Sequence, residues 1–472
     1  MTSQTSPAQP AAHPAAAAPA AVPPAVASRN PFAVRDFRLL WAGEAVSAFG
    51  DQFALIALPW LALVLTGSSL ALGSVLALMA VPRALLMLIG GVTVDRLSPR
   101  RVMLISNAVR LVAVAALGAV VIAGAAELWM LYAFTLVFGV ADAFFFPAQA
   151  SIVPQLVEPD LLARANGVVQ GTAQASVLVG PAVAGLVVAA LGGEGATAAA
   201  LAGIGVALLV DAATFGISLL TLLAMRARPL VEAASASILD DLKAAFRYIG
   251  AMPGLRWMVL VSLGANFFIV GPFEVGLPVI AYQRLPEGAA AFGVLMSAFG
   301  GGSLAGLAAG AMLPAPRPKR FAVVILGTTG LAGAGLALLR FVSTTLTAGA
   351  LIATSGILLG YGNLLGITWL QSRVAPGLMG RVMSVLMLGS FGLVPVSMLL
   401  SGIAVQVSLD GLLLVAGVSM AVLTVLALLV PTVRLLGLVP PYQAPDAAAG
   451  AGGVASQSSP AAPDEDVACA AA

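Results

Sequence analysis

Long apolar runs constrain this chain more than any other feature. Between residues 37 and 435 there are twelve apolar segments of about 20 residues or more, the length that an α-helix needs to cross a bilayer. They are 37–65, 69–92, 102–124, 128–152, 166–191, 200–225, 256–281, 291–313, 321–341, 345–369, 380–407 and 411–435. Within hydrocarbon the backbone must satisfy its own hydrogen bonds, which favours helices. The sequence therefore predicts an all-α membrane protein with twelve transmembrane helices.

The charged residues are too few for a water-facing surface. Hydrophobic residues make up 60% of the 472-residue chain and charged residues 9%, whereas soluble proteins carry about 25%. We therefore expect the lipid bilayer to be the main environment of the chain. No basic patch contains interleaved aromatic residues, so no nucleic-acid partner is expected.

The basic residues indicate an orientation. Eighteen of the 22 lysines and arginines fall on one side of the predicted membrane, and only Arg284 and Arg340 fall on the other. Arg83 and Arg110 lie inside predicted spans. Because basic loops remain in the cytoplasm, both termini are predicted to be cytoplasmic.

A polar break divides the apolar segments into two sets of six. We predict a six-helix bundle over 35–225, a cytoplasmic linker over 226–255 and a second six-helix bundle over 256–435. In the linker, Leu239, Leu242, Phe246 and Ile249 share a helical face, which predicts an interfacial amphipathic helix. Similar residues at 149–154 and 371–376 favour a parallel repeat. The Ala- and Pro-rich ends, 1–34 and 436–472, are predicted to be disordered cytoplasmic tails.

Several kinds of chemistry are disfavoured. The one histidine, His13, and the one cysteine, Cys469, lie in opposite tails, so no histidine relay, common metal site or intrachain disulfide is expected. Neither Lys243 nor Lys319 belongs to a phosphate-binding loop. With no nucleophile–base pair visible, the chain is not expected to be an enzyme or to need a cofactor. Uphill transport would then depend on an ion gradient or a separate subunit.

Ionisable residues inside the spans are the main candidates for function, because each costs at least about 2.5–3.5 kcal/mol at membrane depth. They are Glu44, Asp51, Arg83, Arg110, Asp142, Asp211 and Glu274. Most belong to the first bundle, which predicts a polar cavity there whose carboxylates bind protons or substrate. Glu274 is the only acid in the second set of spans, which makes it a candidate for contact with a cationic substrate.

A purely structural role is the alternative for these residues. Asp51 or Asp142 would then pair permanently with Arg83, and Asp211 would pair with Arg110. Glu44, closer to the cytoplasmic end of its span, would simply be hydrated.

The turn between the second and third segments combines one acid with three arginines. Gly91, Asp95, Arg96, Arg100 and Arg101 are interpreted as a conformational latch, in which Asp95 contacts a neighbouring helix N-terminus or an arginine in one state only. The alternative is an ordinary solvated basic loop.

The fifth segment contains a second glycine motif. Gly167, Gly180, Pro181 and Gly185 predict a bend that seals or hinges the cavity, with ordinary small-residue packing as the alternative. In the eighth segment, Gly302, Gly306 and Gly310 favour packing within the chain over dimerisation, so a monomer is expected.

From about 35 to 435 the chain resembles the major facilitator superfamily. Gly91, Asp95, Arg96, Arg100 and Arg101 match the signature of that family between its second and third helices, although Ser98 replaces the usual glycine and Pro99 a basic residue. The glycine–proline motif resembles that of antiporter members, with Ser176 and Ala184 in place of glycines. Residues 36–41, 47–52, 161–166 and 380–384 resemble the bacterial branch of macrolide-efflux and enterobactin-exporter-like proteins.

This resemblance implies a multi-pass secondary exporter of the bacterial inner membrane. We expect proton-coupled efflux of a small amphipathic compound, such as a drug, an antibiotic or a siderophore-like molecule, by alternating access. The alternatives are an uncoupled or importing metabolite facilitator, and a lysophospholipid translocator or membrane receptor.

Overall fold

The computed structural model describes residues 30–192, 198–226, 253–374 and 376–439, together with positions 247 and 250. All regular structure in these residues is helical. The first half contains η1 (Pro31–Ala33), α1 (Arg35–Thr66), α2 (Ser69–Leu97), α3 (Pro99–Ile122), α4 (Leu128–Leu156), α5 (Pro159–Gly192) and α6 (Ala198–Ala224).

The second half begins with a helix in three parts, α8 (Pro253–Ala265), the π-helical turn η2 (Asn266–Val270) and α9 (Gly271–Arg284). It continues with α10 (Ala289–Met312), α11 (Pro318–Leu338), η3 (Leu339–Phe341), α12 (Thr345–Arg373), α13 (Pro376–Val407), α14 (Leu409–Leu429), α15 (Pro431–Arg434) and η4 (Leu436–Leu438).

Eleven membrane spans are present among the described residues by length and hydropathy, with α8, η2 and α9 forming one span over Gly254–Arg284. The predicted segment 380–407 corresponds to α13, which is helical over 32 residues but has a shorter apolar part at Gly392–Val407. The all-helical membrane fold is therefore confirmed, whereas the count of twelve spans and the cytoplasmic location of the termini stay predictions.

Short polar caps and prolines set the ends of these helices. The hydroxyls of Ser68, Thr344 and Ser408 accept hydrogen bonds from the backbone N–H of the third residue of α2, α12 and α14. Pro99 and Pro318 occupy first-turn positions of α3 and α11, where no N–H is needed. Some turns are thus very short: Gly67 and Ser68 join α1 to α2, Ser98 joins α2 to α3, and Ser408 joins α13 to α14.

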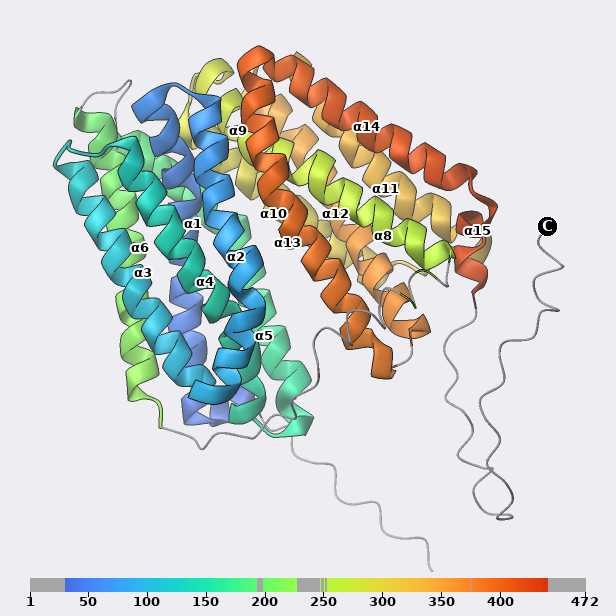
Figure 1. Ribbon diagram of the computed structural model, residues 1–472, viewed down its shortest axis with the longest axis horizontal. Coiled ribbons are helices and arrows are strands. Elements are labelled where there is room, and N and C mark those ends of the chain that lie inside the picture. The colour runs from blue at the N-terminus through green and yellow to red at the C-terminus, as the bar shows by residue number, and fades with distance from the viewer. Residues whose placement is uncertain are drawn as a thin grey trace, which may run out of the picture.

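Two helical bundles result (Figure 1). Helices α1–α6 pack together in the first bundle and α8–α14 in the second. Glycines bring helix axes close together inside each bundle: a Cβ at Gly50 of α1 would overlap Thr214 of α6, and a Cβ at Gly302 or Gly306 of α10 would overlap the backbone of α12. The glycine ladder of the eighth predicted segment therefore packs within the chain.

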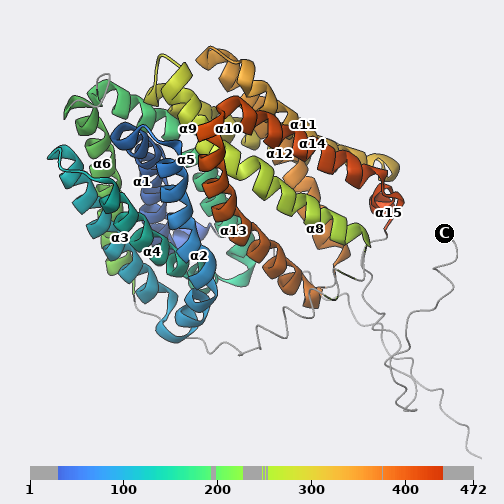
Figure 2. The same ribbon diagram turned by 45° about the horizontal axis from the view of Figure 1, so that its top comes forward.

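The bundles meet through two helix pairs, α2 with α13 and α5 with α10. Gly73 lies against Gly402 in the first pair, and Gly185 lies against Gly293 in the second. The Ser69 hydroxyl also donates to the Gly402 carbonyl at 3.1 Å. These contacts lie in the half of the molecule away from the basic turns, and Figures 1 and 2 show the bundles converging there and diverging toward the other end.

The apolar core follows the same division. The largest buried cluster includes residues of both bundles, such as Phe53, Leu76, Leu277 and Met398, and lies at the junction. Two smaller clusters lie separately, one within each bundle: one contains Phe37 and the other Trp369. The junction therefore stabilises the arrangement at one end, while each bundle has its own core at the other.

Three predicted boundaries differ from the structure. The N-terminal tail expected over 1–34 ends earlier, because η1 forms and Phe32 packs on Phe37 and Trp41. The C-terminal tail expected from 436 begins later, because Leu436 is fully buried and its carbonyl accepts the Trp369 indole N–H at 3.0 Å. Helix α8 starts at Pro253, within the predicted linker. The predicted amphipathic helix, residues 1–29 and residues 440–472 lie outside the described residues.

Candidate functional site

Arg110 is the central charge of the first bundle. It lies near the middle of α3 and is 2% exposed. Its guanidinium donates to Oδ1 of Asp142 on α4 and lies 5.4, 4.0 and 5.5 Å from the ring centres of Phe138, Phe145 and Phe215. The aromatic faces and the carboxylate together stabilise a buried cation that has little access to water.

Asp142 is shared by two arginines. It is 6% exposed, and its second carboxylate oxygen lies 3.6 Å from a terminal nitrogen of Arg83 on α2. The predicted structural pair between Asp142 and Arg83 is therefore present. The alternative pair between Asp211 and Arg110 is absent from the described contacts, because Arg110 pairs with Asp142 instead.

Glu44 belongs to a polar network that connects four helices. It is 8% exposed, so the expectation of a simply hydrated side chain is wrong. The Gln149 amide donates to Oε2 of Glu44 at 2.6 Å, and the Ser218 hydroxyl lies 3.4 Å from Oε1. Asn107 in turn donates to Ser218 at 3.0 Å. The network thus joins α1, α3, α4 and α6 near the arginine pair.

Asp211 and Asp51 are the carboxyls without local compensation. Asp211 is fully buried on α6, and neither of its carboxylate oxygens has a hydrogen-bond partner among the described residues. One carboxylate oxygen of Asp51 on α1 is also buried, and no described residue forms a hydrogen bond with it. The Thr214 hydroxyl donates its single hydrogen to the backbone carbonyl of Asp211 at 2.7 Å, so it cannot also donate to the carboxylate. Both acids lie within electrostatic range of Arg110.

Glu274 lies across the junction, on α9 of the second bundle. The charge of Arg83 acts on it from α2, so Arg83 faces one acid in each bundle. Glu274 follows η2 and Pro272, where the regular helical bonding changes and the Ser397 hydroxyl donates to the Phe267 carbonyl. A π-helical turn of this kind often accompanies a functional or hinge position.

The structure therefore brings together most of the candidates that were selected from the sequence. Glu44, Asp51, Arg83, Arg110, Asp142 and Asp211 form one cluster inside the first bundle, and Glu274 faces it. Asn107, Gln149 and Ser218 were missed. Polar residues inside apolar segments could have indicated them, but such residues are common, and only the folded chain shows which ones meet.

The basic turn has a partner at the end of α6. Arg100 donates from Nε to the Leu222 carbonyl at 2.9 Å and from a terminal nitrogen to the Leu223 carbonyl at 3.0 Å. Arg35 donates to the Ala224 carbonyl at 3.2 Å. These cations stabilise the negative end of α6. Arg96 and Arg101 are exposed, a Cβ at Gly91 would meet nothing within 4 Å, and the side chain of Asp95 lies outside the described part.

The glycine–proline motif of α5 faces two helices. A Cβ at Gly180 would overlap Gln52 of α1, and a Cβ at Gly185 would overlap α10, whereas the space around Gly167 is open. Pro181 lies inside an uninterrupted helix, and the next residue, Ala182, donates its N–H to Ser297 of α10 at 2.9 Å. Three of the four residues are therefore interface residues between α5 and its neighbours.

A separate set of charges lies at the rim of the second bundle. Arg284 pairs with Asp410 at 2.8 Å and donates to the Arg340 carbonyl. The Thr345 hydroxyl donates to the Glu287 carboxylate at 2.5 Å, and this bond lowers the pKa of Glu287. These groups lie at helix ends and in turns of the second bundle, so they are not part of the buried cluster of the first bundle.

The fold consists of two helical bundles that meet through two helix pairs, and the first bundle has a charged core. This arrangement is typical of a class of membrane transporters. The sequence profile of the Major Facilitator Superfamily matches residues 40–395. The chain belongs to this superfamily, which consists of transporters rather than enzymes, and the resemblance recognised from its motifs is confirmed.

Individual relatives are efflux proteins. The chain is 25% identical to the multidrug efflux pump Tap of Mycobacterium tuberculosis over 86% of its own length and 95% of that protein. It is 27% identical to Tap of Mycolicibacterium fortuitum over 87% and 98%. It is 30% identical to macrolide efflux protein A of Streptococcus pyogenes over 32% of its own length and 37% of that protein.

Solved structures share the fold at low sequence identity. The nucleoside transporter NupG superposes with a TM-score of 0.65 at 15% identity, covering 84% of this chain and 98% of NupG. A bacterial homologue of the lysosomal transporter Spinster gives a TM-score of 0.58 at 15% identity, with 87% and 98% covered. At these identities the likeness establishes the fold alone.

Proposed function

We propose that this chain exports a small amphipathic compound from a bacterial cell in exchange for protons, by alternating access in the inner membrane. The observation that carries the proposal is the excess of carboxyls in the buried cluster. Four acids, Glu44, Asp51, Asp142 and Asp211, face two arginines, and Asp211 has no hydrogen-bond partner among the described residues. Efflux is supported by the relatives, which are named as multidrug and macrolide efflux proteins.

The charge balance of the cluster leads to proton binding. Fully ionised, four carboxylates and two arginines would have a net charge of −2 in a region with little access to water. An unpaired buried charge is far more costly than a neutral group, so protons are the simplest compensation. Asp142 already has two arginine partners. Asp51 and Asp211 are therefore the acids that we propose to bind and release protons.

Alternating access would connect these protons to the movement of the bundles. The contacts of the junction lie away from the basic turns, so with those turns in the cytoplasm the protein opens inward. Opening the junction would separate α2 from α13 and move Arg83 relative to Glu274, which lie on opposite bundles. Arg83 would then act more strongly on Asp142, and the proton affinity of the cluster would change with conformation.

Two motifs are proposed to assist this movement. The basic turn, with Gly91, Asp95, Arg96, Arg100 and Arg101, would act as the latch, and the bonds of Arg100 to the end of α6 support such a role. Gly180, Pro181 and Gly185 would let α5 slide or bend against α10. The bundles over 35–225 and 256–435 would move as the two units, each protein acting as a monomer.

A transport assay with purified protein tests the coupling. In proteoliposomes with an imposed pH gradient, the native protein should accumulate radiolabelled erythromycin, and a protonophore should abolish this accumulation. Asp51→Asn and Asp211→Asn should lose gradient-driven accumulation but retain exchange of labelled for unlabelled compound. Asp160→Asn, at the exposed start of α5, is the matched control and should behave as the native protein.

Other outcomes select other functions. Full gradient-driven accumulation in both Asp51→Asn and Asp211→Asn would exclude these acids from coupling. Exchange without any proton movement in the native protein would indicate an uncoupled or importing facilitator. Transport of a labelled lysophospholipid, with no transport of erythromycin, would indicate a lipid translocator.

A further inference from the structure

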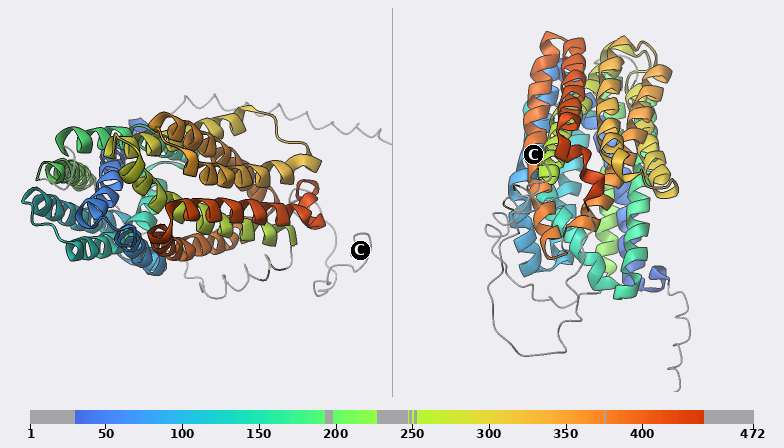
Figure 3. Two further views of the ribbon diagram at one scale, coloured as in Figure 1. Left: turned by 90° about the horizontal axis from the view of Figure 1, so that it is seen from above. Right: turned by 90° about the vertical axis from the view of Figure 1, so that its right-hand side faces the viewer.

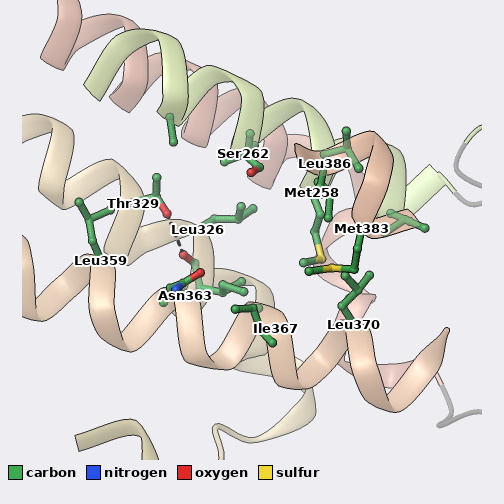
Figure 4. Close-up of a pocket in the computed structure, with 17 residues that line it drawn as sticks. Met258, Ser262, Leu326, Thr329, Leu359, Asn363, Ile367, Leu370, Met383 and Leu386 are labelled. Atoms are coloured by element: carbon green, nitrogen blue, oxygen red, sulfur yellow. Dashed lines mark hydrogen bonds between the residues drawn. The ribbon is translucent and has the colours of Figure 1, made fainter. Parts of the chain in front are cut away.

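The second bundle contains a cavity that the buried charges do not reach. Its volume is about 330 Å³, and it lies between α8, α11, α12 and α13 (Figure 4). All of its lining residues fall between 255 and 386, whereas six of the seven charged candidates lie in the first bundle. The cavity is therefore distinct from the proton-binding cluster.

The packing of the second bundle explains why space remains there. Helix α12 packs closely on α10 and on α11, and α14 packs on α11. Viewed from above, the bundle forms two rows, with α10–α12 in gold on one side and α14 in red with α8 in yellow-green on the other (Figure 3). The cavity lies between these rows, where Ser262 on α8 faces Asn363 on α12.

The lining has two chemically different ends. Met258 and Met383 bring their sulfur atoms together at one end, beside Leu370 and Leu386 (Figure 4). Methionine is flexible and polarisable, so this end can adapt to apolar groups of different shape. Toward the other end lie the polar residues of the lining, which are Ser262, Thr329 and Asn363. The lining residues include no charged side chain.

Asn363 is the polar group best placed to recognise a ligand. The residue is exposed and lines the cavity inside the membrane-spanning helix α12, and its amide makes no hydrogen bond to any described residue. The Thr329 hydroxyl donates to the Ile325 carbonyl at 3.3 Å and remains available as an acceptor. A side-chain amide can donate two hydrogen bonds and accept two. Inside a membrane span it needs a partner, because an unsatisfied polar group is costly in hydrocarbon. A ligand with both donor and acceptor groups would satisfy it.

We propose that this cavity is a binding site for an uncharged amphipathic molecule, held by Asn363 and Ser262 at its polar end and by the two methionines at its apolar end. The volume is at the lower limit for drug-sized ligands, and the mixture of a mostly apolar wall with few polar groups is typical of such sites. A charged ligand would have no counter-charge in this lining and would lose its hydration. The site rests on the proposed export function, for which it supplies a substrate class.

Equilibrium binding tests the site without any gradient. The probe is radiolabelled chloramphenicol, an uncharged compound with an aromatic ring, hydroxyls and an amide, dialysed against the purified full-length protein in detergent. Asn363→Leu keeps the size of the side chain but removes its hydrogen bonds and should weaken binding at least tenfold. Ser262→Leu reduces the cavity and should have a similar effect. Thr354→Leu is the control. Residue 354 lies nine positions before Asn363, which places it on the opposite face of α12.

A cysteine reporter gives a second measurement. The chain has one cysteine, so Met383→Cys in a Cys469→Ser background carries a single thiol at the apolar end of the cavity. Chloramphenicol should slow its reaction with a maleimide severalfold, and adding Asn363→Leu should remove this protection. Thermal melting of each variant identifies any that fails to fold.

The proposal is overturned if the native protein shows no saturable binding. It is also overturned if folded Asn363→Leu and Ser262→Leu bind as tightly as the native protein. Binding that depends on Asn363 in a protein that moves no protons would support the site and contradict the proposed coupling. The two inferences can therefore fail separately.

Discussion

The two bundles share a helical plan but differ in what they bury. The first encloses four carboxyls, two arginines and a network of amides and hydroxyls between α1, α3, α4 and α6. The second has one such acid, Glu274, at the junction, and it otherwise encloses apolar side chains around a cavity with three polar groups. Single glycine contacts differ as well: a Cβ at Gly50 of α1 would overlap Thr214 of α6, whereas a Cβ at Gly276 of α9 would make an ordinary contact with Leu413 of α14.

This difference suggests a division of labour. Buried charges need a dense, well-defined surrounding, because every missing partner costs free energy. A binding site for varied molecules instead needs space and adaptable side chains. In the proposed function, the charges bind protons in one bundle and the cavity binds the compound in the other, so the two requirements do not conflict.

The largest effect should come from breaking the buried ion pair of the first bundle. Asp142→Asn leaves the guanidinium of Arg110, which is 2% exposed, without its carboxylate. Loss of one partner from a buried pair costs about 3–5 kcal/mol. We expect a matching loss in the free energy of unfolding, measured by denaturant titration in detergent, together with loss of transport. Unchanged unfolding would show that the first bundle tolerates an unpaired arginine and would weaken the comparison.

A methyl group added at the helix contacts should distinguish the bundles next. Gly50→Ala places a Cβ against Thr214 and should cost about 1–3 kcal/mol through overpacking of α1 and α6. Gly276→Ala in α9 places its Cβ 3.6 Å from Leu413, an ordinary contact, so its unfolding free energy should be unchanged or slightly raised. Equal losses in thermal-melting assays of the two variants would mean that the bundles are packed alike.

Asp211→Asn should separate stability from transport. The carboxyl has no hydrogen-bond partner among the described residues, so its replacement by an amide removes no ionic bond. We expect the unfolding free energy to change by less than about 1 kcal/mol, because the substitution creates no cavity and breaks no ion pair. A drop as large as that of Asp142→Asn would show that Asp211 is a structural residue instead.

The smallest effect should come from the ion pair of the second bundle. Asp410→Asn breaks the contact with Arg284, but these side chains are 40% and 25% exposed at the rim. Exposed pairs contribute about 0–1 kcal/mol and are screened by salt. The melting temperature should therefore fall only slightly, and less in high salt. A loss that is large and independent of salt would contradict this placement at the surface.

Sequence reasoning identified the cluster residues by a simple rule. An ionisable side chain within an apolar segment is costly, and Arg110, Asp142 and Asp211 stood out for that reason alone. The same rule could not decide their pairing, because α2 can present Arg83, and α3 can present Arg110, to several acids. Only the packed bundle shows that Asp142 has both arginines and Asp211 has neither.

The cavity of the second bundle was not foreseen at all. Met258, Asn363 and Met383 are ordinary residues in three distant segments, and no spacing along the chain connects them. A cavity is the space left by packing, which depends on the relative positions of four helices. The tail boundaries failed for a related reason, since Phe32 and Leu436 border proline-rich segments, and their order depends on contacts with α1 and with α11 and α12.

By itself the sequence determined the helical membrane fold, the division into halves and the location of costly charges. Hydrophobicity and backbone hydrogen bonding act locally, so twenty apolar residues suffice to specify a helix in a membrane. The tertiary structure alone decided which charges are paired, which end of the molecule is closed and where space remains for a ligand. These properties depend on contacts between segments that are distant in the sequence. Rotating a helix so that another face points inward would give its side chains different partners.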